Sequence, residues 1–168
     1  MALILNGDTG ITYPVATATG SATQASAGRV LQVVTAYLDN IATTTTSTSF
    51  VTTGFSASIT PSSSSSKVLV IVTGGSIYCQ TVANNGYFGT IYRNNSTNLG
   101  NASFGFERFT TAGGTYSLAP HSMSVLDSPA TTSSTTYTPY FRSNGGSQAD
   151  FSNTDRGTVT MTLMEISA

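Results

Sequence analysis

His121 is the only histidine of the chain and therefore the first candidate for a catalytic base. Nucleophilic hydrolysis needs a nucleophile, a base and an orienting acid within hydrogen-bond reach of one another. Asp127 lies six residues further along the same expected strand, so both side chains share a face but stand roughly 20 Å apart. The sequence also lacks the Gly-x-Ser-x-Gly elbow of many hydrolases. We therefore expect a structural histidine and no catalytic residue.

The carboxylates are the other candidates, because a glycosidase needs two of them across a cleft. Glu165 ends the last expected strand, where a salt bridge or protection of a sheet edge explains it. Asp150 and Asp155 flank an expected loop and, with Asn153, offer oxygen ligands for calcium, but they lack the EF-hand spacing and its bidentate glutamate. We predict no cofactor and no metal, and leave open a calcium ion near Asp150 and Asp155. The remaining acids considered are Glu107 and Asp127.

Composition excludes several functional classes. The 168 residues include 6 Lys and Arg and 7 Asp and Glu, for a formal net charge of −1, so no basic cluster is present to bind nucleic acid. One cysteine and one histidine exclude a disulfide framework and a Cys/His zinc site. The longest apolar run, residues 68–72, is too short to cross a bilayer, and the first residues lack the basic start of a signal peptide.

The shortage of charge is itself informative. Charged residues make up 8% of the chain, against roughly 25% in ordinary globular proteins, while 30 Thr and 24 Ser are present. Such a chain either buries much of its surface against partners or presents hydroxyl groups to water. Both possibilities favour a structural or adhesive protein over a metabolic enzyme.

The elements that would hold these residues are strands. Apolar and hydroxyl residues alternate over residues 49–60 and 158–166, the pattern of strands with one buried face, whereas residues 67–73 are apolar on both faces. Turn-forming Asn-Gly and Gly-Gly pairs separate the segments. Eight such strands predict an all-β fold, an antiparallel, jelly-roll-like β-sandwich. The other five strands are expected at residues 29–38, 87–93, 104–110, 115–126 and 135–142.

Residues 1–27 contain too few large apolar side chains for a core of their own. We therefore expect an N-terminal arm and linker over residues 1–27, ordered mainly by neighbouring chains, followed by the sandwich domain over residues 28–168.

Several segments together resemble structural proteins of tailed bacteriophages, in particular short tail fibres and other virion-surface proteins of phages that infect marine bacteria and cyanobacteria. The segments cover most of the chain and read ILNGDTGITYP from Ile4, GRVLQVV from Gly28, TSTSFVTTGFSASITPSSSSSKVLVIV from Thr46, IYRNNSTNLG from Ile91, LDSPATTSSTTYTPYFRS from Leu126 and VTMTLMEI from Val159.

The resemblance implies a virion protein with a distal sandwich similar to the tumour-necrosis-factor jelly roll, assembled as a homotrimer. It implies that the arm joins the tail or baseplate and that the sandwich contacts the host surface, where a glycan is the expected ligand. A chain of 168 residues has no long shaft, so a capsid decoration protein is the alternative, and a small polysaccharide-degrading domain is a third reading. The residues expected to attach the arm are Leu3, Leu5, Asn6, Asp8, Ile11 and Tyr13.

Two further sets of residues are predicted from their chemistry. Sugars stack on aromatic rings and bind to amides, so loops that combine both are receptor candidates: Asn84, Asn85, Tyr87, Tyr92, Asn94, Asn95 and Asn144. The chain also has more aromatic residues than one core of this size requires, so several are expected between subunits of a closed assembly. The candidates for that interface are Phe106 and Tyr140.

Overall fold

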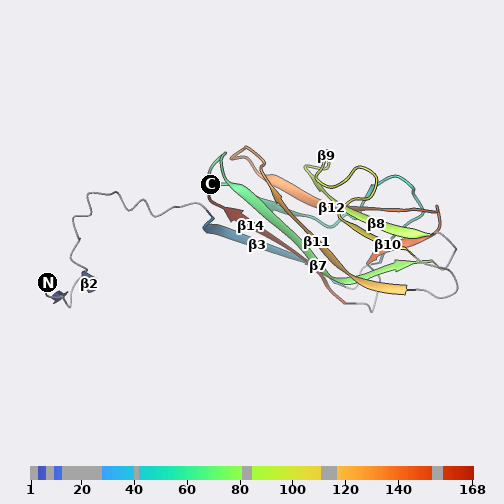
Figure 1. Ribbon diagram of the computed structural model, residues 1–168, viewed down its shortest axis with the longest axis horizontal. Helices are drawn as coiled ribbons and strands as arrows, with labels where there is room; N and C mark the ends of the chain where they lie inside the picture. Colours follow the sequence, from blue (N-terminus) through green and yellow to red (C-terminus); the bar gives the residue numbers. More distant parts are fainter. Residues whose placement is uncertain are drawn as a thin grey trace.

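The computed structural model describes residues 4–6, 10–12, 28–39, 42–80, 85–110, 117–152 and 157–168. Every regular element in these ranges is a strand, and the strands that form the sandwich pack as two antiparallel sheets (Figure 1). The predicted all-β antiparallel sandwich is therefore confirmed. No helix in the described ranges is long and apolar enough to cross a membrane.

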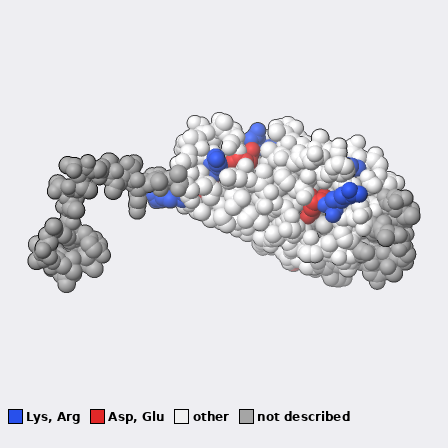
Figure 2. Space-filling view, viewed as in Figure 1, with Lys and Arg blue, Asp and Glu red and all other residues white. Residues whose placement is uncertain are grey.

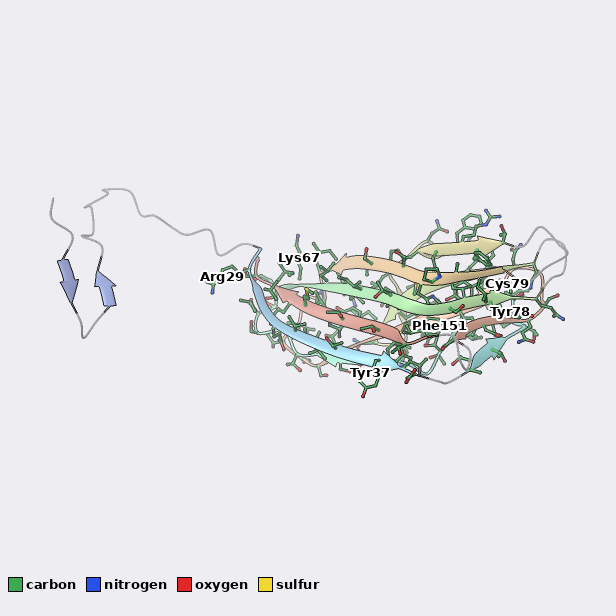
Figure 3. The ribbon with its side chains drawn as sticks, turned by 90° about the horizontal axis from the view of Figure 1, so that it is seen from below. Arg29, Tyr37, Lys67, Tyr78, Cys79 and Phe151 are labelled. Atoms are coloured by element: carbon green, nitrogen blue, oxygen red, sulfur yellow. The ribbon has the colours of Figure 1, made fainter. Side chains whose placement is uncertain are left out.

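The first sheet, which we call the β7 sheet, is built around one long strand. Its members are β3 (Val30–Leu38), β4 (Thr43–Thr45), β7 (Lys67–Cys79), β11 (Ser117–Asp127), β13 (Ala149–Ser152) and β14 (Val159–Ile166). Strand β11 pairs with one side of β7, while β14 and β13 pair end to end with the other side. Strand β3 lies outside β14, so β3, β14, β7 and β11 run side by side (Figure 3).

The second sheet, the β8 sheet, faces it. It contains β5 (Val51–Thr52), β6 (Ala57–Ile59), β8 (Gly86–Arg93), β9 (Thr97–Asn98), β10 (Glu107–Thr110) and β12 (Thr135–Ser143). Strands β8 and β12 form its centre, with β9 and β10 on the outer side of β8 and with β5 and β6 on the outer side of β12.

Alternation along the strands places the core between the sheets. On β14 the inward side chains Val159, Met161 and Leu163 are fully buried, and Val68, Val70 and Val72 on β7 are buried beside them. Burying an aliphatic side chain of this size is worth roughly 1.5–3 kcal/mol, so these strands supply a large share of the stability.

One expected strand is wrong in part: residues 49–60 form two short strands, β5 and β6, rather than one. The partner strand β12 contains Pro139, which has no N–H to donate on this side, so the ladder is interrupted there. The Pro139 carbonyl accepts instead from the Thr53 backbone N–H and hydroxyl at 3.1 and 2.9 Å. Gly54 then turns the chain with φ +75°.

Within the sandwich, three strands were not expected, namely β4, β9 and β13. Strand β4 is a run of threonines with no apolar alternation, and β9 is only two residues long. Strand β13 corrects the expectation of a loop at Asp150, which is buried and paired with Tyr78 in the ladder with β7. The expected strand at 104–110 starts only at Glu107.

At the N-terminal end, β1 (Ile4–Asn6) and β2 (Gly10–Thr12) form a separate two-stranded sheet. Its ladder pairs Leu5 with Ile11 and Asn6 with Gly10. The other proposed attachment residues, Leu3, Asp8 and Tyr13, lie outside the described residues. The division into an arm over 1–27 and a domain over 28–168 stays a prediction.

Candidate functional site

The outer face of the β8 sheet carries an open pocket of about 470 Å³. A segment that we call the flap, residues 100–105 between β9 and β10, forms one wall, and the chain before β5 forms the other. The lining residues are Thr48, Ser49, Phe50, Tyr92, Ala102, Ser103 and Arg142.

Arg142 contacts the β8 sheet, the flap and the opposite wall of the pocket. Its guanidinium lies over the Phe88 ring, 4.3 Å from the ring centroid, and over Phe50 at 5.5 Å. It donates hydrogen bonds to the carbonyl oxygens of Ser103 in the flap and Thr48 in the opposite wall. Burial lowers the pKa of Arg142 from its ordinary value, which reflects a cation that has lost part of its hydration.

The aromatic floor of the pocket is rigid. Tyr92 on β8 stacks on Tyr140 of β12, with ring centroids 4.1 Å apart and planes inclined by 27°. Such stacked pairs contribute about 0.5–1.5 kcal/mol beyond the buried area. Tyr92, predicted as a receptor residue, therefore presents a fixed ring at the pocket.

The flap can approach the sheet only because it contains glycine. Gly105 has φ +69°, and a Cβ atom on it would lie 2.0 Å from the Gly89 carbonyl oxygen. The neighbouring Phe106 N–H donates to that same oxygen at 2.7 Å. A side chain at position 105 would break this contact and lift the flap.

Replacing Gly105 with alanine is expected to lower the free energy of unfolding by about 2 kcal/mol or more, through backbone strain plus the steric clash. Gly54→Ala is the matched control, because Gly54 also has a positive φ but open space around it. Urea unfolding of both variants measures the difference. Equal costs at the two positions would contradict the close packing of the flap.

Two predicted receptor residues are corrected by their burial. Asn85 is 1% exposed, donates to the Gln80 and Gln148 carbonyl oxygens at 3.1 Å and accepts from the Ser143 hydroxyl at 2.9 Å. Tyr87 is fully buried in the core. Neither side chain can contact a ligand at the surface.

The remaining receptor candidates differ in position. Asn94 and Asn95 both have positive φ in the turn after β8, as the asparagines of a tight hairpin should, and both are exposed. Asn144 is exposed beyond β12, and Asn84 lies outside the described residues. Of the described residues in the predicted set, only Tyr92 lines the pocket.

The outer face of the β7 sheet is a second candidate surface. Paired residues place Val33, Met164, Leu69 and Leu126 in one row across β3, β14, β7 and β11. Val33 is 53% exposed and Leu126 is 51% exposed. Of the seven exposed large hydrophobic residues in the described ranges, six lie on β3 or β11: Val30, Leu31, Val33, Tyr37, Leu118 and Leu126.

The predicted interface residues are placed differently. Phe106 packs against the core and Tyr140 is stacked on Tyr92, and both are partly buried within the subunit. Their role between subunits stays a prediction.

Figure 2 shows small groups of charged side chains separated by broad uncharged areas, and Figure 3 shows Tyr37 pointing away from the β7 sheet.

His121 is buried where the edges of the two sheets meet. Its Nδ1 lies 2.7 Å from a Glu107 carboxylate oxygen, and its Nε2 contacts the Phe151 carbonyl oxygen. Both ring nitrogens of His121 therefore have a polar partner inside the protein. With its side chain 0% exposed and both nitrogens occupied, it has no access to a substrate.

The Glu107 carboxylate has further neighbours. Its second oxygen accepts from the Ser122 N–H at 3.1 Å. Tyr87 lies beside it, and burial together with this carboxylate raises the pKa of Tyr87 well above its ordinary value. The contact between Glu107 and His121 thus joins β10, an edge strand of the β8 sheet, to β11, an edge strand of the β7 sheet.

Asp127 has different partners from His121. It accepts from Arg93 at 2.8 and 3.0 Å and from the Tyr137 hydroxyl at 2.8 Å. Burial and the hydrogen bond to Asp127 raise the pKa of Tyr137. Because Arg93 and Tyr137 belong to the β8 sheet and Asp127 to the β7 sheet, this cluster joins the two layers.

Glu165 is a buried acceptor rather than half of a salt bridge. It accepts from the Ser62 N–H and hydroxyl at 2.7 and 2.6 Å and from Gln32 at 2.7 Å. Burial alone would raise the pKa of Glu165, but these bonds and one from Ser66 lower it to about 2. The residue thereby holds the turn between β6 and β7 against β14.

This lowered pKa predicts a pH dependence. The charged form is favoured in the folded state, so the stabilisation is complete above the ordinary pKa of 4.5 and is lost as the pH falls towards about 2. Glu165→Gln is expected to lower the free energy of unfolding by about 2 kcal/mol at pH 7, with the difference shrinking towards pH 2. Urea unfolding across this range checks it, and a pH-independent difference would contradict it.

No group of three metal-ligating side chains occurs in the described part of the chain. Asp150, one of the proposed calcium ligands, is buried in β13 and accepts from Gln148 Nε2 at 2.9 Å. Asn153 and Asp155 lie outside the described residues.

No protein-family model matches this sequence, and no curated protein matches it. Three similar solved structures come from infectious bursal disease virus. The structure from the Gt strain has 16% sequence identity to this chain and a TM-score of 0.42, and the match covers 84% of this chain and 39% of that one. For the T13 viral particle the sequence identity is 14% and the TM-score is 0.42, and the match covers 99% of this chain and 39% of that one. For the VP2 subviral particle the sequence identity is 14% and the TM-score is 0.41, and the match covers 81% of this chain and 37% of that one. This chain therefore spans about two fifths of the length of these neighbours.

Proposed function

We propose that this chain is a non-enzymatic structural protein of a virion, a homotrimeric tail fibre or adhesin. Its arm, residues 1–27, attaches to the tail or baseplate, and its sandwich contacts a glycan on the host surface. The resemblance to phage tail-fibre segments gives this proposal its biological setting, and the two surfaces described above give it a physical basis.

The observation that carries the proposal is the apolar row Val33–Met164–Leu69–Leu126 on the outer face of the β7 sheet. Exposed apolar surface of this kind is an association hazard in a lone protein. Strands β3 and β11 are moreover edge strands of that sheet in the described residues, and edge strands are ready sites for pairing with another chain. A closed ring of identical subunits covers both features, and we propose this face as the contact between copies.

Glycan contact is supported by the other sheet. The pocket beside Tyr92 combines fixed aromatic rings with the hydroxyl groups of Thr48, Ser49 and Ser103. Three copies of one weak site on a trimer act together and raise avidity by about 100-fold or more.

Labelling purified virions with antibody against the sandwich tests the proposal. We expect label at the tail, and binding of the purified protein to host cells. Label over the capsid without host binding would favour the decoration protein instead. Particles free of label, beside abundant protein in the infected lysate, would contradict a virion role.

A further inference from the structure

Among the described residues, the cation in the pocket on the β8 sheet has no acidic partner. Arg93 pairs with Asp127 and His121 contacts Glu107, and neither contact involves Arg142. The described residues that line the pocket include no Asp or Glu. Arg142 donates hydrogen bonds to the carbonyl oxygens of Thr48, Ser103 and Ser143. These neutral acceptors satisfy N–H donors of the guanidinium but do not neutralise its charge.

Such a guanidinium favours one class of ligand group. A planar guanidinium binds a carboxylate through two parallel hydrogen bonds, and the interaction strengthens where the cation has lost water. Arg142 sits over the Phe88 ring and under the flap, so it is partly desolvated before any ligand arrives. An anionic group entering the pocket would supply the missing negative charge.

The rest of the pocket fits a sugar ring. Its volume of about 470 Å³ lies within the range of ~300–1,000 Å³ typical of small-molecule sites. Tyr92 and Phe50 offer aromatic surfaces for the apolar face of a pyranose, and Thr48, Ser49 and Ser103 offer hydroxyl groups for its own hydroxyls. The stacking of Tyr92 on Tyr140 fixes the ring in advance, which reduces the entropy lost on binding.

We propose that this pocket binds an acidic sugar, a pyranose that carries a carboxylate, with its ring against Tyr92 and its carboxylate on Arg142. The inference rests on the proposed contact with a host glycan and names the chemical class of that glycan.

A matched pair of ligands tests it. Methyl β-glucuronide and methyl β-glucoside differ only in a carboxylate against a hydroxymethyl group. Titrated into the ¹⁵N-labelled full chain, the glucuronide is expected to shift the amide signals of Ala102, Ser103 and Arg142 and to bind about tenfold more tightly than the glucoside. Equal affinities, or no shift at these amides at high millimolar concentration, would overturn the proposal. Equally tight binding of acetate would also overturn it, because the sugar ring would then contribute nothing.

Variants separate binding from folding. Arg142→Gln is expected to remove the preference for the glucuronide, and Arg142→Lys to restore it only in part. Arg108→Gln is the control, because Arg108 also lies over Phe88, at 5.5 Å, but does not line the pocket. If Arg142→Gln disturbs the flap, Tyr92→Leu provides a second test and should weaken both glycosides. Equal losses of affinity for the glucuronide in Arg108→Gln and Arg142→Gln would refute the proposed binding site. The outcome of virion labelling does not depend on either variant, so the two proposals can fail separately.

Discussion

Replacing His121 with leucine is expected to lower the free energy of unfolding by about 2–4 kcal/mol. The substitution removes the imidazole that contacts the Glu107 carboxylate, 10% exposed, and the Phe151 carbonyl oxygen, and leaves both acceptors without it. The cost of an unpaired buried charge exceeds the gain from the added apolar side chain. Urea unfolding at pH 7 measures the effect.

The double variant His121→Leu/Glu107→Leu provides the control. Replacing both members of a buried ion pair by apolar residues is often neutral, so the double variant should be more stable than His121→Leu alone. The coupling energy from the complete cycle is expected to reach about 2 kcal/mol. Additive losses would show that the His121 and Glu107 side chains do not act as a pair.

The second large effect is expected on assembly. The double variant Val33→Glu/Leu126→Glu places charges at both ends of the apolar row, on the edge strands β3 and β11. Burying such charges between copies is costly, so the double variant should sediment as a single protomer of 17.3 kDa. Because both positions are about half exposed in the subunit, the variant protomer should stay folded, and its circular-dichroism spectrum should match that of the unmodified chain.

Tyr140→Asp on the β8 sheet is the matched comparison. If the contact between copies lies on the β7 sheet, this variant keeps the oligomer of the unmodified chain. Loss of the oligomer in Tyr140→Asp, with retention in the Val33 and Leu126 variant, would place the interface on the β8 sheet instead.

The strands were predictable where side chains alternate against a core. Residues 158–166 illustrate this, because each inward position from Val159 to Leu163 is fully buried in β14. The split of residues 49–60 was not predictable, because it depends on Pro139 in the partner strand, 86 residues from Thr53 along the chain. Strand β4 carried no apolar signal at all.

The aromatic residues divide into two groups within the subunit. Tyr87, Tyr137, Phe141 and Phe151 fill the core. A second group lies on the outer face of the β8 sheet, where Arg108 and Arg142 lie over three of the rings and Phe104 is itself part of the flap: Phe50, Phe88, Tyr92, Phe104 and Tyr140. The aromatic count predicted several of these residues between subunits, and that stays a prediction.

The candidate site was only partly visible in the sequence. Tyr92 was predicted because an aromatic residue precedes two asparagines, but the pocket also needs residues 48–50, 102–103 and 142, which only the folded sheet brings together. His121 was correctly placed on a strand, whereas its partner Glu107 could not be identified. That contact depends on how β10 and β11 meet at the sheet edges.

Sedimentation equilibrium of the unmodified full chain at low micromolar concentration tests the proposed self-association most directly. The account predicts a mass close to three protomers of 17.3 kDa each, unchanged on moderate dilution. A stable single protomer of 17.3 kDa under these conditions would contradict it.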